Sequence, residues 1–208
     1  MTELFVFDRA DEPLPEEAER LLPAWRRERL AGLRNPAARQ ESLAAGLLWR
    51  LALSRRGVPQ EAEIAVLGAG KPVLAGREDV WFSLSHSGRY VLCAVGSRPV
   101  GTDVQEMRPV KRSVVRYFHP AEQAWLKERD PSEERAFFHL WSRKEAWVKA
   151  LSGDRMLSLA EADVIHALPG LRFYDYDFPG GYQAALCTSE EALPPVLTAR
   201  SELLRETL

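Results

Sequence analysis

Near its middle the chain reads VGTDVQE, residues 100–106, a β-forming stretch that carries a carboxylate among valines and a threonine. Successive side chains of a strand point to opposite faces, so Asp103 and Gln105 share one face while Glu106 points the other way. A buried carboxylate is costly unless it is paired. Gly101 allows another chain or a ligand to approach closely. The stretch predicts either a cation site at Asp103 and Gln105, which suits Mg²⁺, or an aspartate that ends an edge strand.

Further along, residues 137–150 read FFHLWSRKEAWVKA, which predicts a helix. Trp141, Glu145 and Lys149 are spaced four residues apart and therefore share one face. Lys144 lies about 100° round the helix from Glu145 and can reach a neighbouring group. The spacing is typical of an ordinary Glu–Lys pair beside core aromatics, but it also suits an acid and a base placed for chemistry. The helix alone does not separate these two interpretations.

Before the VGTDVQE stretch lie two segments rich in small residues, GAGKP at 68–72 and FSLSHSG at 82–88. Small residues let backbone amides approach a ligand, and Lys71, Ser85 and His86 offer donors to a phosphate. The first segment lacks the spacing of a P-loop, and the second is not the nucleophile elbow of a serine hydrolase. The alternative is a histidine with a structural role in a turn.

The periodicity of the apolar residues predicts helices followed by strands in each half of the chain. In the first half we expect a strand at 4–7, helices at 16–34 and 36–56, and strands at 64–67, 80–84, 90–95 and 100–104. In the second half we expect helices at 114–118, 120–128 and 131–151, strands at 173–178 and 182–187, and a short helix in the tail after 190. This order predicts an α+β fold with two similar α+β subdomains, residues 1–102 and 103–208, and a site between them.

The composition excludes several classes of protein. The chain has 208 residues, of which 46% are hydrophobic and 28% charged, with a net charge of −2. Disorder, collagen, coiled coil and a polycation that coats nucleic acid are excluded. Cys93 and Cys187 lie in apolar runs, which favours buried free thiols. With neither a signal peptide nor a membrane span in the sequence, we expect a cytoplasmic protein that binds neither nucleic acid nor membrane.

Taken in order, the GKP, FSLSHSG, VGTDV and FHLWSRKEAWVK motifs resemble the 4′-phosphopantetheinyl transferases of the surfactin-synthetase-activating type. The resemblance covers almost the whole chain, and these enzymes have two similar α+β halves. It implies that the phosphopantetheine arm of coenzyme A moves to a serine of an apo acyl or peptidyl carrier protein. Adenosine 3′,5′-bisphosphate is then the second product.

The resemblance also implies which residues act in the reaction. Asp103 and Glu145 would bind Mg²⁺ on the pyrophosphate of coenzyme A, with Gln105 at the metal directly or through a water. Glu145 would also be the general base for the carrier serine. Lys149 would neutralise the α-phosphate, with Lys144 a weaker candidate for the same role.

Other residues are implied to contact coenzyme A. Lys71, Ser85 and His86 match phosphate- or nucleotide-contacting positions, and Arg34 or Arg39 would meet the 3′-phosphate. The family often has a second acid where this chain has Gln105. Because an amide removes one negative charge, we expect weaker Mg²⁺ binding.

The partner implied by the resemblance is a carrier protein that is acidic around its modified serine. The basic residues after the VGTDVQE stretch are a candidate docking surface for it, or simply a solvated charge run: Arg108, Lys111, Arg112 and Arg116. The resemblance implies a monomer. Two other functions remain open, a non-catalytic module that binds coenzyme A or a carrier protein, and a different Mg²⁺-dependent phosphotransferase on the same fold.

Overall fold

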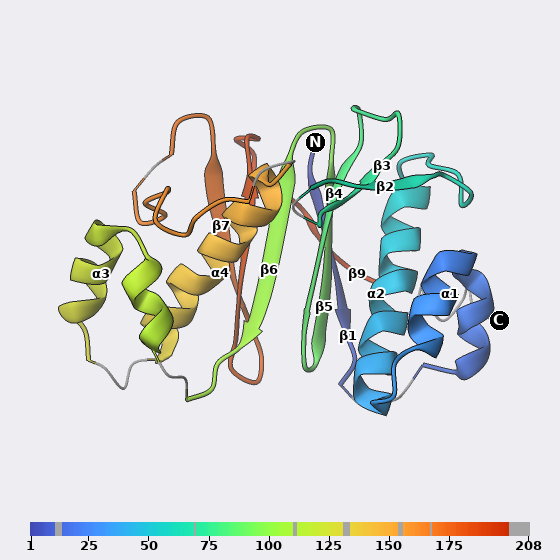
Figure 1. Ribbon diagram of the computed structural model, residues 1–208, viewed down its shortest axis with the longest axis horizontal. Helices are drawn as coiled ribbons and strands as arrows, with labels where there is room; N and C mark the ends of the chain where they lie inside the picture. The colour runs from blue at the N-terminus through green and yellow to red at the C-terminus, as the bar shows by residue number, and fades with distance from the viewer. Residues whose placement is uncertain are drawn as a thin grey trace.

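The strands of the computed structural model form two main sheets that lie face to face, and a long helix covers the outer face of each (Figure 1). The structure describes residues 1–10, 14–68, 70–109, 112–130, 134–153, 156–166 and 168–199. The layers are therefore helix, sheet, sheet and helix, which confirms the α+β class. Of the described helices, none is both long enough and apolar enough to cross a membrane.

The two halves of the chain share one order of strand pairing. The first half contains β1 (Glu3–Asp8), the 3₁₀ helix η1 (Glu16–Leu21), α1 (Ala24–Ala31), α2 (Pro36–Ser54), β2 (Ile64–Val66), β3 (Pro72–Leu74), β4 (Trp81–Ser87) and β5 (Tyr90–Gly96). The second contains β6 (Val100–Glu106), the 3₁₀ helix η2 (Arg112–Tyr117), α3 (Pro120–Lys127), α4 (Glu134–Leu151), β7 (Arg172–Phe178), β8 (Tyr182–Thr188) and β9 (Val196–Thr198). In each half the last strand of a hairpin returns to pair antiparallel with the opening strand, β5 with β1 and β8 with β6.

Four local expectations from the sequence need correction. The helix expected at 16–34 is interrupted, because Pro23 forces Leu22 into an extended conformation that ends η1. The short strand β3 was not expected. The Ser-His-Ser segment belongs to β4, and the turn begins only at Gly88, whose φ is +49°. In the tail a strand, β9, pairs parallel with β1 where a helix was expected.

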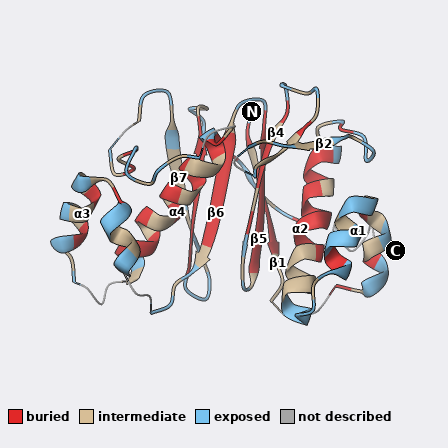
Figure 2. Ribbon diagram, viewed as in Figure 1, coloured by how far each residue is buried: buried red, intermediate tan, exposed pale blue. Residues whose placement is uncertain are grey.

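The central strands β1, β5 and β8 are buried on both faces, and β5 and β6 are mainly red in Figure 2, whereas β7 is more exposed. In β1, Phe5 and Phe7 belong to the core under α2, whereas Leu4 and Val6 belong to the core between the sheets. The same alternation places Cys187 of β8 in the core under α4. This double burial explains why the strands are continuous apolar runs rather than alternating ones.

Serine side chains join the two sheets where their edge strands β4 and β6 meet. The backbone N–H groups on the open edge of β6 need acceptors, because a buried unpaired donor is costly. The hydroxyls of β4 accept them in register: Thr102 N to Ser83 Oγ at 3.1 Å, Val104 N to Ser85 Oγ at 3.2 Å and Glu106 N to Ser87 Oγ at 3.0 Å. We call these three contacts the serine seam. They replace a backbone ladder and fix β6 against β4.

Helix α4 lies directly on β6 at Gly101. A Cβ atom built there would lie 2.0 Å from the carbonyl oxygen of Ala146 and 2.4 Å from the amide nitrogen of Ala150. Real side chains do not pack at such distances, so only glycine permits this approach. The close neighbour that Gly101 was expected to admit is therefore the backbone of α4.

Replacing Gly101 by alanine tests this packing. We expect Gly101→Ala to lower the free energy of unfolding by about 3 kcal/mol, because the methyl group must displace helix backbone rather than a flexible side chain. Urea denaturation measures the change. Gly153→Ala is the matched control, since its Cβ would meet nothing within 4 Å, and it should change stability by less than about 0.5 kcal/mol. Equal effects of the two substitutions would contradict the close approach.

Candidate active site

Asp103 lies at the point where β4, β6 and α4 meet, and its carboxylate accepts three side-chain hydrogen bonds. Asp103 is only 2% exposed. Oδ1 accepts from Ser85 Oγ at 2.8 Å and from Lys149 Nζ at 2.6 Å, and Oδ2 accepts from Gln105 Nε2 at 2.9 Å. The prediction that Asp103 and Gln105 share a face is confirmed. The structure also brings Lys149 to this carboxylate, as an ion pair between two distant parts of the sequence.

Glu145 precedes Lys149 by one turn of α4 and is half-buried. Burial raises the pKa of Glu145, the negative charge of Asp103 raises it further, and the ammonium of Lys149 lowers it. A carboxylate with a raised pKa accepts a proton more readily than an ordinary carboxylate does, and it can release that proton again near pH 7. The two acids and the lysine thus influence one another electrostatically.

The donor set fits a hard divalent cation. Asp103 and Glu145 offer carboxylate oxygens, and Gln105 offers an amide oxygen, which are the ligand types that Mg²⁺ prefers. The ammonium of Lys149 already occupies a cation position on Asp103. Within the described ranges, no group of three or more His, Cys, Asp or Glu residues is placed to hold a metal ion. A complete protein cage is not required, because Mg²⁺ commonly takes one or two carboxylates plus waters and phosphates.

Ser85 and His86 point to opposite sides of β4. Ser85 is buried inside the serine seam, where it donates to Asp103, so its hydroxyl supports the acid instead of facing open space. His86 is exposed, and its Nδ1 lies 3.2 Å from a carboxylate oxygen of Glu41. Burial lowers the pKa of His86, Glu41 raises it, and the charge of Lys149 lowers it. His86 is therefore at the rim of the Asp103 cluster.

Lys71 and Lys149 line a pocket of about 260 Å³ between β3, β4 and the end of α4. The ammonium of Lys71 donates to the carbonyl oxygen of Ala150 at 3.1 Å and lies 5.5 Å from the ring centre of Trp81. Burial lowers the pKa of Lys71 to about 8. The pocket thus contains two lysines, one from each half of the chain, and one of them, Lys149, pairs with Asp103.

Two of the basic residues expected at phosphates, Lys144 and Arg39, are paired with acidic side chains of the protein. Lys144 is fully buried, with its ammonium 2.7 Å from the Glu122 carboxylate. Arg39 donates to Glu19 at 2.5 Å and to the carbonyl oxygen of Leu30 at 3.0 Å, at the end of α1. Arg34 is exposed. The sequence did not show which acidic neighbours Lys144 and Arg39 would meet.

Arg26 is a basic residue that the sequence reasoning missed. It lines a cavity of about 530 Å³ together with Arg29 and Gly70. Its guanidinium lies 5.1 Å from the ring centres of both Trp25 and Trp49, and burial lowers its pKa to about 10. Among the residues described, no acidic side chain pairs with it. In the sequence, the arginine-rich run at 26–29 could have pointed to a phosphate-binding residue here.

The expected docking residues are only partly described. Arg108 follows β6, and Arg116 is exposed in η2, where it donates to the Tyr117 hydroxyl at 2.6 Å. Lys111 and the side chain of Arg112 lie outside the described residues.

Comparison with known proteins identifies the family. The model of the 4′-phosphopantetheinyl transferase superfamily matches residues 99–190. A 4′-phosphopantetheinyl transferase of Bacillus subtilis is 38% identical over 44% of this chain and 42% of its own length. The 4′-phosphopantetheinyl transferase Sfp of Bacillus subtilis (strain 168) is 27% identical over 90% and 93%, and psf-1 of Bacillus pumilus is 34% identical over 66% of each chain. The chain belongs to the 4′-phosphopantetheinyl transferase superfamily.

Proposed function

We propose that this protein transfers the phosphopantetheine arm of coenzyme A to a serine of an apo acyl or peptidyl carrier protein. The observation that carries the proposal is the cluster of Asp103, Glu145 and Lys149 beside a pocket that also contains Lys71. Phosphoryl transfer requires the charge on the phosphate oxygens to be neutralised and the nucleophile to be held in line. A buried acid, a second acid of raised pKa and two lysines supply these requirements in one place.

In the proposed reaction Glu145 takes a proton and Lys149 neutralises negative charge on the leaving group. Glu145 accepts the proton of the carrier serine as its oxygen forms a bond to the β-phosphorus of coenzyme A. The bond from that phosphorus to the bridging oxygen breaks, and the bridging oxygen leaves with adenosine 3′,5′-bisphosphate. Lys149 neutralises the α-phosphate that carries the new negative charge, for which it exchanges its present partner, Asp103.

We propose Mg²⁺ as the cofactor, held by Asp103 and Glu145 with the amide oxygen of Gln105 in reach. When bound, the ion would neutralise charge on the pyrophosphate. Gln105 presently donates its amide N–H to Asp103, which orients the carboxylate without adding charge. Because Gln105 adds no negative charge to the cation site, it also favours the second candidate function, a module that binds coenzyme A or a carrier protein without catalysis.

The nucleotide end of coenzyme A is proposed to lie toward the cavity of Arg26 and Arg29. A half-buried guanidinium with no acidic partner in the described part of the chain is suited to a phosphate. The cavity and the lysine pocket share Gly70 in their linings. The paired Arg39 is less available for the 3′-phosphate than was expected from the sequence.

We also propose that the chain divides into residues 1–102 and 103–208 with the site between the halves, and that the protein is a cytoplasmic monomer. The acidic surface of the carrier protein is proposed to dock on four basic residues, Arg108, Lys111, Arg112 and Arg116. The shared pairing order of the two halves supports two subdomains, with all of β6, which spans residue 102, in the second sheet. The contact of β4 with β6 supports a site between them.

Isosteric replacement of the two acids tests the proposed reaction. We expect Asp103→Asn and Glu145→Gln each to reduce transfer at least about 100-fold, because each removes a negative charge without removing volume. Mass spectrometry of an apo carrier protein incubated with coenzyme A and Mg²⁺ measures the gain of phosphopantetheine. Glu128→Ala, an exposed carboxylate after α3, is the control and should transfer normally. If the unmodified protein binds coenzyme A but modifies no carrier protein, the binding module is the correct function.

Gln105→Glu tests whether this side chain lies at the cation. We expect the variant to reach half-maximal activity at a lower Mg²⁺ concentration, because a third carboxylate strengthens the site. Glu106→Gln is the matched control, since this neighbouring side chain lies on the opposite face of β6, and its Mg²⁺ requirement should stay unchanged. An unchanged requirement in Gln105→Glu would place the side chain outside the metal's coordination shell.

The pH dependence of coenzyme A binding tests Lys71. Because the pKa of Lys71 is about 8, its ammonium is charged at pH 7 and loses its proton as the pH rises toward 9. We expect affinity for coenzyme A to fall about tenfold over this range, the order of one charge-assisted hydrogen bond. Isothermal titration calorimetry measures the affinity. Lys71→Arg stays charged and should bind equally well at both pH values. The same decline in both proteins would assign the effect to another group.

A further inference from the structure

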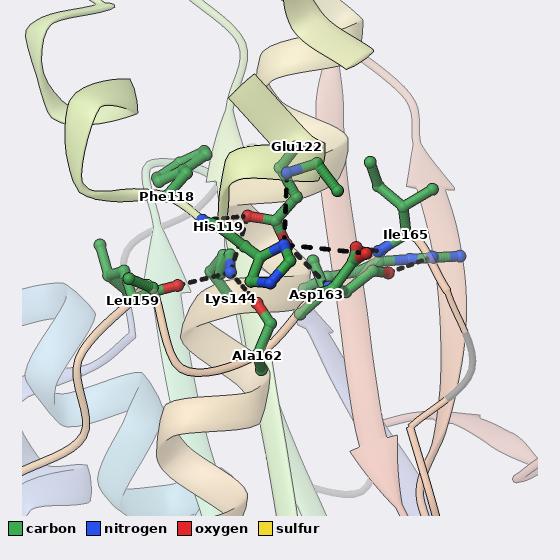
Figure 3. Close-up of polar contacts among 12 residues, drawn as sticks. Phe118, His119, Glu122, Lys144, Leu159, Ala162, Asp163 and Ile165 are labelled. Atoms are coloured by element: carbon green, nitrogen blue, oxygen red, sulfur yellow. Dashed lines mark hydrogen bonds and ion pairs between the residues drawn. The ribbon is translucent and has the colours of Figure 1, made fainter. Parts of the chain in front are cut away.

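Lys144 is the neighbour of Glu145 in sequence, yet its ammonium is enclosed on a different side of α4 (Figure 3). Three oxygen atoms accept its three protons. They belong to the Glu122 carboxylate at 2.7 Å, the Leu159 carbonyl at 2.5 Å and the Ala162 carbonyl. The side chain is completely buried, and its hydrogen-bonding capacity is filled by the protein itself.

Glu122 extends this contact to two other parts of the second half. Its Oε2 accepts from the backbone N–H of His119 at 3.0 Å, which caps the start of α3. Its Oε1 accepts from the backbone N–H of Val164 at 2.7 Å. Glu122 is itself fully buried. One ion pair therefore ties α4 to α3 and to the segment at 156–166.

Asp163 holds that segment in place from its outer side. Its Oδ1 accepts from the Ile165 N–H at 3.1 Å, and its Oδ2 contacts His166 Nδ1 at 2.6 Å. His119 lies 3.8 Å from the same oxygen (Figure 3). The carbonyl groups that receive Lys144 thus belong to a segment that Glu122 and His119 contact at residues 163 and 164, and the ammonium has a defined receptor.

A buried ion pair is a poor way to gain stability, because desolvation cancels most of the attraction and apolar residues of equal volume often serve as well. Its distinctive property is a fixed geometry. Gly101 sets how closely α4 approaches β6, but this contact with helix backbone does not by itself specify which side chains of the helix face Asp103. Lys144 supplies a second attachment about 100° round the helix from Glu145.

We propose that Lys144 is a positioning residue for the transfer reaction. Its attachment to Glu122 and to the carbonyls of Leu159 and Ala162 fixes the rotation of α4, so that Glu145 and Lys149 face Asp103. The inference rests on the proposed roles of these three residues. It gives Lys144 a function that needs no contact with a phosphate.

The double variant Lys144→Met/Glu122→Gln tests the proposal. It removes both charges, keeps the volume, and leaves an oxygen acceptor for the N–H groups of His119 and Val164. We expect kcat to fall about 10- to 100-fold through misplacement of Glu145, with KM for coenzyme A within about twofold of the parent. Arg135→Met is the control, because it removes an exposed ion pair to Asp177 from the same helix without touching the 156–166 segment, and it should retain full activity.

Two kinetic outcomes overturn the proposal. A large rise in KM with unchanged kcat would mean that Lys144 binds the phosphate, and unchanged values of both in a folded variant would mean a merely structural pair. If the double variant does not fold, Glu122→Gln alone is measured by the same criteria.

A crystal structure of the variant supplies a readout that does not depend on activity. We expect the 2.6 Å contact between Lys149 and Asp103 to be lost, and its retention overturns the proposal. A parent protein that modifies no carrier would contradict the proposed function but leave this structural criterion in force.

Discussion

The site depends on how the open edge of β6 is closed. A strand edge buried against another sheet must find acceptors for its N–H groups, and here the hydroxyls of β4 provide them. Ser85 does this while also donating to Asp103. The group that joins the two sheets is therefore the same group that holds the central carboxylate, so that the packing of the halves and the position of the acid are one structural feature.

The glycine at position 101, on the same face of β6 as Asp103, completes this arrangement. Because α4 rests on bare backbone there, Lys149 reaches Asp103 without crossing an intervening layer of side chains. The proximity of the charges then follows. Glu145, whose pKa is raised by burial and by Asp103, and Lys71, whose pKa is lowered by burial, both have perturbed protonation equilibria at the same junction. Such clustering is typical of functional sites.

Patterns in the sequence predicted the elements that have strong local signals. The strands at 90–95, 173–178 and 182–187 were expected and are present, and the shared face of Asp103 and Gln105 followed from strand alternation. The break at Pro23 had a local signal that the periodicity of leucines and arginines outweighed. The arginine-rich run at residues 26–29 was visible in the sequence, but nothing there distinguishes Arg26 from its neighbours.

The parts that sequence could not predict depend on contacts between distant segments. Helical spacing shows that Lys144 is turned away from Glu145, but its receptor is formed by carbonyls beyond residue 156. The pairing of β9 with β1 joins the two ends of the described chain and leaves no periodic trace. The contacts of Ser85 with Asp103 and with the backbone of β6 could not be predicted either, because the sequence does not show which partner a serine will meet.

The central claim is that the junction of β4, β6 and α4 holds a divalent cation and the pyrophosphate of coenzyme A. A crystal structure with coenzyme A and Mn²⁺, located by its anomalous scattering, tests this most directly. The account predicts the metal between Asp103 and Glu145, with the pyrophosphate between Lys71 and Lys149. A metal bound elsewhere, or coenzyme A outside the lysine pocket, would contradict it.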